Sequence, residues 1–124
     1  MSQILVTGGL GYIGSHTVVE LIEAGYEPIV LDNLSESPLE VKSRIETIVG
    51  HEIIFRQVEL CNLAEIDALF KEFPEITGVI HFAAFLLVNE SVDLPLKYYH
   101  NNLLSTINLL QSMEAHGIRN IVFS

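Results

Sequence analysis

The stretch Ile4-Leu5-Val6-Thr7-Gly8-Gly9-Leu10-Gly11-Tyr12-Ile13-Gly14 decides the fold of this chain. An apolar run ends in a glycine-rich loop and a helical pattern follows, which predicts a strand, a tight turn and a helix N-terminus. We expect Gly8 to permit the turn, Gly11 to let backbone N–H groups approach a diphosphate, and Gly14 to let the helix pack closely on the strand. Unpaired amides and the helix dipole then form an anion site. The glycine pattern alone also fits a plain strand-to-helix turn.

The composition favours a single α/β domain, or part of one, within residues 1–124. Apolar residues make up 49%, which excludes a disordered chain and suits a sheet buried on both faces. A net charge of −10 argues against nucleic acid and against an anionic membrane surface. It also means that backbone amides must provide most of the binding to any phosphate.

Three features predict a cytoplasmic chain. No apolar run reaches a membrane-spanning length, and no cationic leader precedes the first strand. Cys61 is the single cysteine, so no internal disulfide is expected, in agreement with a reducing compartment. We interpret Cys61 as a small buried or loop thiol.

Apolar strands alternate with helical patterns along the whole chain. Strands are expected at 4–7, 28–31, 52–58, 77–82 and 120–124, and helices at 12–24, 38–49, 63–70 and 95–116. Asn62 is the expected N-cap of the third helix. This order predicts a doubly wound, Rossmann-like parallel sheet with strand order 3-2-1-4-5, ending after the fifth strand. A ligand is expected over the C-terminal strand ends, at the switch between strands 1 and 4.

The last helix carries apolar residues on more than one side. Tyr99, Leu103, Ile107 and Leu110 share one face, which we expect to pack on the core. Tyr98 and Leu109 lie away from that stripe, which suggests burial on two sides.

Asp32 lies eighteen residues after Gly14, at the end of the second expected strand. A carboxylate there accepts hydrogen bonds from an adenosine ribose and repels a 2′-phosphate. No Arg or Lys follows before Lys42, so the sequence favours NAD over NADP. The other interpretation of Asp32 is a turn residue ahead of Asn33.

The histidines do not form a metal-binding pattern. His81 ends an apolar strand, and a buried, hydrogen-bonded histidine is the favoured interpretation, with metal or acid/base chemistry as the alternative. The spacing of His16, His51, His100 and His116 offers no ligand set, so no metal is expected. Glu90 and Ser91 are interpreted as a loop hydrogen-bond pair or cap.

Several motifs together resemble the extended short-chain dehydrogenase/reductases. They are Thr7 to Thr17, Leu31-Asp32-Asn33-Leu34, Ile80-His81-Phe82-Ala83-Ala84, Glu90-Ser91-Val92, Pro95-Leu96-Lys97-Tyr98-Tyr99, Asn101-Asn102 and Ile121-Val122-Phe123-Ser124. The first block indicates only the superfamily. The blocks from Glu90 to Asn102 make the chain similar, over its whole length, to the UDP-glucose 4-epimerases within it.

The resemblance implies an NAD site and assigns its residues. Gly8, Gly11, Tyr12, Ile13 and Gly14 would hold the diphosphate, and Asp32 and Asn33 the adenosine ribose. Glu59 and Leu60 would flank the adenine, Phe82 and Ala83 would pass beside the cofactor, and Asn101 would help to fix it. In that family NAD removes a hydride from C4 of the sugar and returns it to the other face. Self-association is also expected, as a homodimer or a larger assembly, and the resemblance implies that the side of the last helix with Tyr98 and Leu109 helps to form the homodimer.

The chain departs from the family pattern at several positions. Glu59 stands where Asp is usual, and Leu86 where a diphosphate-binding Lys is usual. Gly is also common at positions 84 and 89, which here are Ala and Asn.

The catalytic pair of the family is a tyrosine four residues before a lysine. None of Tyr12, Tyr26, Tyr98 and Tyr99 has a lysine at that spacing. The resemblance therefore implies an NAD-binding portion with no catalytic residues of its own, which meets a UDP-sugar only in the full-length family member. Two alternatives stay open: a fragment of another sugar-nucleotide dehydratase or decarboxylase, and a non-catalytic nucleotide-binding or interaction module.

Overall fold

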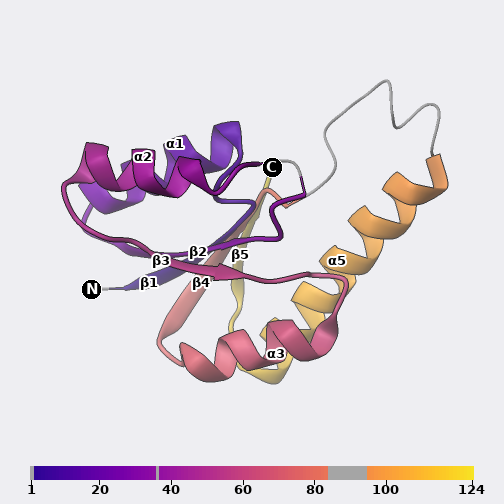
Figure 1. Ribbon diagram of the computed structural model, residues 1–124. Coiled ribbons are helices and arrows are strands. Elements are labelled where there is room, and N and C mark those ends of the chain that lie inside the picture. Colours follow the sequence, from indigo (N-terminus) through magenta and orange to yellow (C-terminus); the bar gives the residue numbers. More distant parts are fainter. Residues whose placement is uncertain (1, 36, 84–94) are drawn as a thin grey trace.

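Five parallel strands form one sheet in the order β3-β2-β1-β4-β5. A computed structural model describes residues 2–35, 37–83 and 95–124, apart from the side chain of Tyr98 (Figure 1). The strands are β1 Gln3–Thr7, β2 Glu27–Asp32, β3 Ile54–Gln57, β4 Ile76–His81 and β5 Asn120–Phe123. The helices are α1 Tyr12–Glu23, α2 Glu40–Val49, α3 Leu63–Glu72 and α5 Pro95–Ala115. The predicted fold and strand order are confirmed.

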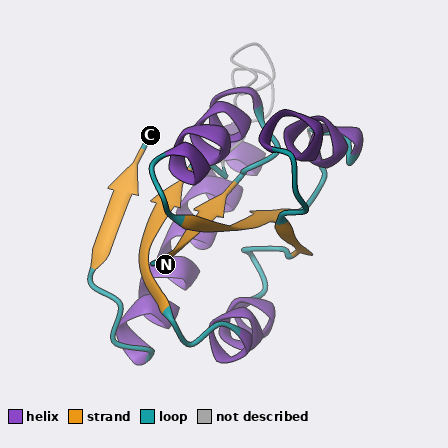
Figure 2. Ribbon diagram, turned by 90° about the vertical axis from the view of Figure 1, so that its left-hand side faces the viewer, coloured by secondary structure: helices purple, strands orange, loops and turns teal. Residues whose placement is uncertain are grey.

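Helices cover both faces of the sheet: α1 and α2 on one, α3 and α5 on the other (Figures 1 and 2). Successive residues of a strand point to opposite faces. Leu5 accordingly belongs to the core cluster under α3 and α5, while Val6 belongs to the cluster under α1 and α2. Both side chains are fully buried. This two-sided burial explains why the strands read as continuous apolar runs.

Local signals determine where two of the helices begin or end. The Asn62 side chain accepts hydrogen bonds from the Ala64 N–H at 3.1 Å and the Glu65 N–H at 3.4 Å, which confirms it as the N-cap of α3. At the end of α2, Gly50 takes the left-handed conformation with φ +82°.

The face of α5 that packs on the sheet differs from the expected one. The four residues of the expected core stripe are all at least 42% exposed: Tyr99, Leu103, Ile107 and Leu110. The buried face carries Ser105, Asn108, Leu109, Ser112 and Met113. This face tolerates polar residues because they find partners: the Asn108 side chain donates to the Leu60 carbonyl at 2.9 Å. The predicted stripe is therefore an exposed apolar face, which we call the α5 outer face.

Two other apolar residues on helices are also largely exposed. Ile13 is 56% exposed in the first turn of α1, and Ile48 is 68% exposed near the end of α2. Val18 and Ile45 anchor these helices in the core instead. Within the described parts of the chain, no helix has the length and apolarity needed to cross a bilayer.

Candidate functional site

The glycine-rich loop between β1 and α1 is held against the end of β2. The N–H groups of Gly8 and Gly9 both donate to the Leu31 carbonyl, at 2.8 and 3.3 Å. Gly8 has φ +66°, a conformation that favours glycine. The expected tight turn at Gly8 is confirmed.

The start of α1 is open toward the solvent. Gly11 is the N-cap residue and has extended backbone, and no side chain caps the helix there. No acidic residue lies in the first turn, and Tyr12 is 82% exposed. The first N–H groups of a helix lack partners within the helix and carry its positive partial charge. This terminus is therefore suited to an anion.

Close packing inside the loop depends on two further glycines. A Cβ added at Gly14 would collide with the Gly8 carbonyl, and one at Gly9 would lie 2.6 Å from a Val30 methyl group. Gly14 thus lets the helix pack on the loop and not, as expected, on the strand β1, while Gly9 lets the loop pack on the Val30 side chain of β2. Gly9 is part of the glycine-rich stretch, but roles were expected only for Gly8, Gly11 and Gly14, and this packing role for Gly9 was not predicted from the sequence.

Asp32, at the end of β2, joins the loop to the next turn. Its Oδ2 accepts from the Leu10 N–H at 3.3 Å and its Oδ1 from the Leu34 N–H at 2.9 Å. Leu34 has φ +64°, so this carboxylate supports a turn in which a non-glycine residue is left-handed. Asp32 is 7% exposed and lies at the C-terminal edge of the sheet, beside the glycine loop.

Asn33 and Glu59 meet at the same edge, after β2 and β3. The Asn33 amide donates to Glu59 Oε2 at 2.9 Å, and the Cys61 N–H donates to Glu59 Oε1 at 3.1 Å. Burial and the neighbouring Glu59 carboxylate raise the pKa of the Cys61 thiol above its ordinary value. Leu60 points into the core and is 3% exposed. Glu59 is therefore the polar member of this pair at the sheet edge.

The remaining predicted residues approach from β4 and α5. A Cβ on Gly8 would lie 2.9 Å from the Ala83 nitrogen and 2.9 Å from the Phe82 carbonyl carbon, so the loop touches this backbone directly. Asn101, on α5, lies beside Cys61, with its Oδ1 3.6 Å from the Cys61 sulfur. The structure thus brings Phe82 and Ala83 against the glycine loop and places Asn101 next to the Glu59 turn.

Several cationic side chains are held in ion pairs. Lys42 pairs with Glu46 at 2.9 Å, Arg56 with Glu72 at 2.7 Å, and Lys71 with Asp67 at 3.0 Å. The pKa of each carboxyl group is lowered by hydrogen bonds. The largest cause is the Ile53 N–H for Glu46, the His116 ring for Asp67 and the Arg56 guanidinium for Glu72; Lys42 and Lys71 are the second causes for Glu46 and Asp67. The α1 N-terminus places a positive partial charge at the glycine loop, apart from these ion pairs.

His81 is buried and hydrogen-bonded, as the favoured interpretation predicted. It is 5% exposed, and burial lowers the pKa of its imidazole to about 4. Across the described ranges, no three His, Cys, Asp or Glu side chains gather so as to hold a metal ion. Leu86, Asn89, Glu90 and Ser91, with Ala84, lie outside the described residues.

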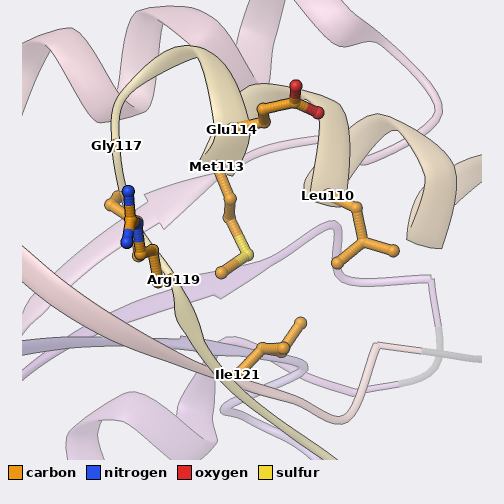
Figure 3. A pocket seen from close by; sticks show the side chains of 7 residues that line it. Leu110, Met113, Glu114, Gly117, Arg119 and Ile121 are labelled. Carbon is orange, nitrogen blue, oxygen red and sulfur yellow. The ribbon is translucent and has the colours of Figure 1, made fainter.

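A cavity of about 370 Å³ lies elsewhere, between the end of α5 and the start of β5 (Figure 3). Its lining includes Met113, Arg119 and Ile121, and no predicted site residue borders it. The candidate site is therefore the edge of the sheet at the glycine loop, and not this cavity.

This sheet order, with a glycine turn before α1 and a carboxylate after β2, defines the class of Rossmann-like α/β domains, in which nucleotides bind at this edge. Within that class, the chain belongs to the NAD dependent epimerase/dehydratase family, whose model matches residues 4–124.

Relatives of known function agree with this assignment. The chain is 53% identical to a UDP-glucose 4-epimerase of Dictyostelium discoideum over 122 residues, which cover 98% of this chain and 35% of that protein. It is also similar to the crystal structure of UDP-glucose 4-epimerase from Bifidobacterium longum in complex with NAD+ and UDP, with a TM-score of 0.94 and 40% identity. That match covers 98% of this chain and 36% of the other. The chain thus spans about a third of the length of these relatives.

Proposed function

We propose that this chain is the N-terminal NAD-binding portion of a UDP-glucose 4-epimerase. The observation that carries the proposal is the glycine loop. It leads into the open N-terminus of α1, and its Leu10 N–H donates to the Asp32 carboxylate. Epimerases of similar structure from Bifidobacterium longum and Thermus thermophilus hold NAD. Another sugar-nucleotide enzyme is not favoured, because relatives that match 98% of the chain at 53% identity are UDP-glucose 4-epimerases.

In the proposed complex, each part of the site has a separate task. The amides at Tyr12, Ile13 and Gly14 bind the diphosphate, because a chain of net charge −10 must rely on backbone donors. Gly11 lets the diphosphate approach, while its own N–H donates to the Gly8 carbonyl at 3.0 Å. Asp32 and Asn33 bind the adenosine ribose. Glu59 and the backbone of Leu60 flank the adenine, since the Leu60 side chain is buried in the core. Phe82 and Ala83 border the cofactor, and Asn101 fixes it from α5.

The chain alone is proposed to be inactive as an epimerase. Proton transfer at the sugar 4-hydroxyl needs a positioned acid/base group, and no tyrosine of this sequence lies four residues before a lysine. UDP-sugar binding and turnover are accordingly assigned to the longer family members.

Calorimetric titration of the purified chain tests this function. We expect NAD to bind, UDP-glucose not to bind, and no conversion of UDP-glucose to UDP-galactose in a preparation free of host epimerase. Binding of neither ligand would favour a non-catalytic interaction module, and turnover by the chain itself would overturn the proposal.

We also propose a homodimer that uses the α5 outer face, in a cytoplasmic protein. Tyr99 is 68% exposed and Ile107 is 55% exposed on that face, and large apolar side chains gathered on one helix surface indicate a partner. The net charge opposes association only at long range, and salt screens it. The resemblance points instead to the side of this helix that carries Leu109, but Leu109 is fully buried in the core, so the proposal uses the exposed face.

A further inference from the structure

A chain of hydrogen bonds joins three elements behind the glycine loop. His81 Nδ1, at the end of β4, lies 2.6 Å from the Thr7 hydroxyl at the end of β1. His81 Nε2 lies 3.2 Å from the Thr106 hydroxyl on α5. Thr7 is fully buried and His81 is 5% exposed, so little water reaches the contact between them, while Thr106 is partly exposed.

The Thr7 hydroxyl also holds the backbone that follows β4. Its oxygen accepts from the Ala83 N–H at 3.2 Å and from the Phe82 N–H at 3.1 Å. The Phe82 N–H is shared with the Thr7 backbone carbonyl at 3.0 Å, whereas the hydroxyl is the partner of the Ala83 N–H among the described residues. A threonine hydroxyl has two acceptor positions and one proton. With both acceptor positions facing N–H groups, the hydroxyl proton is left to donate, and His81 Nδ1 is the acceptor in front of it.

This assignment determines the state of the imidazole. If Nδ1 accepts, it carries no proton, and the neutral ring has its proton on Nε2. That N–H then donates to the Thr106 hydroxyl. A proton on Nδ1 would instead point a third donor at the Thr7 oxygen.

We propose that Thr7, His81 and Thr106 form a positioning device: a neutral imidazole with its proton on Nε2 holds the Thr7 hydroxyl so that it fixes the Phe82–Ala83 backbone against Gly8. The ring is also fixed from β5, where the Phe123 ring meets it edge to face at 5.5 Å between centroids. The side chains that bond or stack on the imidazole within the described residues are therefore two hydroxyls and an apolar ring, and none of them titrates near neutral pH.

The device acts on the candidate site through one close approach. Gly8 lies so near the Phe82–Ala83 backbone that an added Cβ would come within 2.9 Å of it. A displacement of this backbone would therefore move one wall of the glycine loop. The consequence for NAD affinity rests on the proposed function, whereas the protonation state of His81 does not.

The first test is nitrogen-15 NMR of the His81 imidazole in the unmodified chain at pH 7, without NAD. We expect a protonated Nε2 and an unprotonated Nδ1. A proton on Nδ1, or an imidazolium, would overturn the proposal.

The second test compares Thr7→Val, which removes the hydroxyl, with Thr7→Ser, which keeps it. Because an unsatisfied buried N–H costs about 1–3 kcal/mol, we expect Thr7→Val to speed amide exchange at Ala83 about tenfold to hundredfold relative to a core amide such as that of Val30. Thr7→Ser should restore most of the protection. Equal effects of the two substitutions would refute the role of the hydroxyl.

Thr77→Val is the matched control, because the Thr77 hydroxyl bonds the Gln3 carbonyl at the opposite end of the same two strands. It should leave exchange at Ala83 and NAD affinity unchanged. With NAD, Thr7→Val should weaken binding about tenfold and Thr7→Ser should not. If the unmodified chain binds no NAD, the proposed function fails while the NMR and exchange results still decide the positioning device.

Discussion

Replacement of Asp32 by asparagine tests the assignment of the cofactor most sharply. The substitution preserves shape and an oxygen that accepts from the Leu34 N–H, at 2.9 Å in the unmodified chain. It removes the negative charge, and it turns an NH₂ group toward the Leu10 N–H, which now bonds Oδ2 at 3.3 Å. Loss of that one long hydrogen bond should lower the free energy of unfolding by about 1–2 kcal/mol, so the variant should still fold.

The charge of Asp32 should set the preference between the two cofactors. Two unit charges roughly 4 Å apart repel by about 4 kcal/mol at an effective dielectric constant of about 20. Solvent and salt at this open edge reduce the effect, so we expect about 2 kcal/mol, or roughly a thirtyfold preference for NAD over NADP. In Asp32→Asn the two cofactors should bind within about threefold of each other, mainly because NADP binding improves.

Isothermal titration calorimetry with both cofactors measures this preference. Asp67→Asn is the matched control, because it removes the same charge from α3, where Asp67 pairs with Lys71 and is 39% exposed. The control should keep the full preference. If the unmodified chain bound NADP as tightly as NAD or more tightly, the role of Asp32 would be refuted. If Asp32→Asn and Asp67→Asn reduced the preference for NAD equally, the effect of Asp32 would be a long-range effect of net charge.

Three further predictions follow from contacts of single residues. Gly14→Ala should abolish NAD binding and destabilise the chain by several kcal/mol in urea unfolding, because the new methyl group would collide with the Gly8 carbonyl. The pKa of His81 is lowered to about 4 by burial, from an ordinary 6.5, so the unfolded chain binds more protons between these values. The free energy of unfolding should therefore fall by about 3 kcal/mol on acidification from pH 6.5 to 4, and His81→Gln should lessen this loss. Ile107→Glu on the α5 outer face should yield monomers in light scattering, whereas Ile48→Glu, at a 68% exposed position of α2, should not. A monomeric unmodified chain would contradict the proposed dimer.

The sequence by itself determined the elements whose causes are local. Glycine at position 8 and asparagine at position 62 act on the few residues around them, so the turn and the helix cap were correctly predicted. The strand order also followed, because alternating strands and helices with right-handed crossovers leave few arrangements. In the candidate site, this reasoning correctly placed the glycine turn and set Asp32 at the end of β2.

Only the tertiary structure decided which surfaces meet. The apolar periodicity of α5 pointed to Tyr99 and Ile107, yet the helix packs through Asn108 and Leu109, because a helix with apolar residues on several sides is oriented by the partners it meets. The hydrogen bond between Thr7 and His81 joins residues 74 positions apart, and no local sequence pattern predicts it. Hydrogen bonds between distant segments depend on distances that the completed sheet sets. For that reason the glycine turn could be predicted from its own residues, and the device behind it could not.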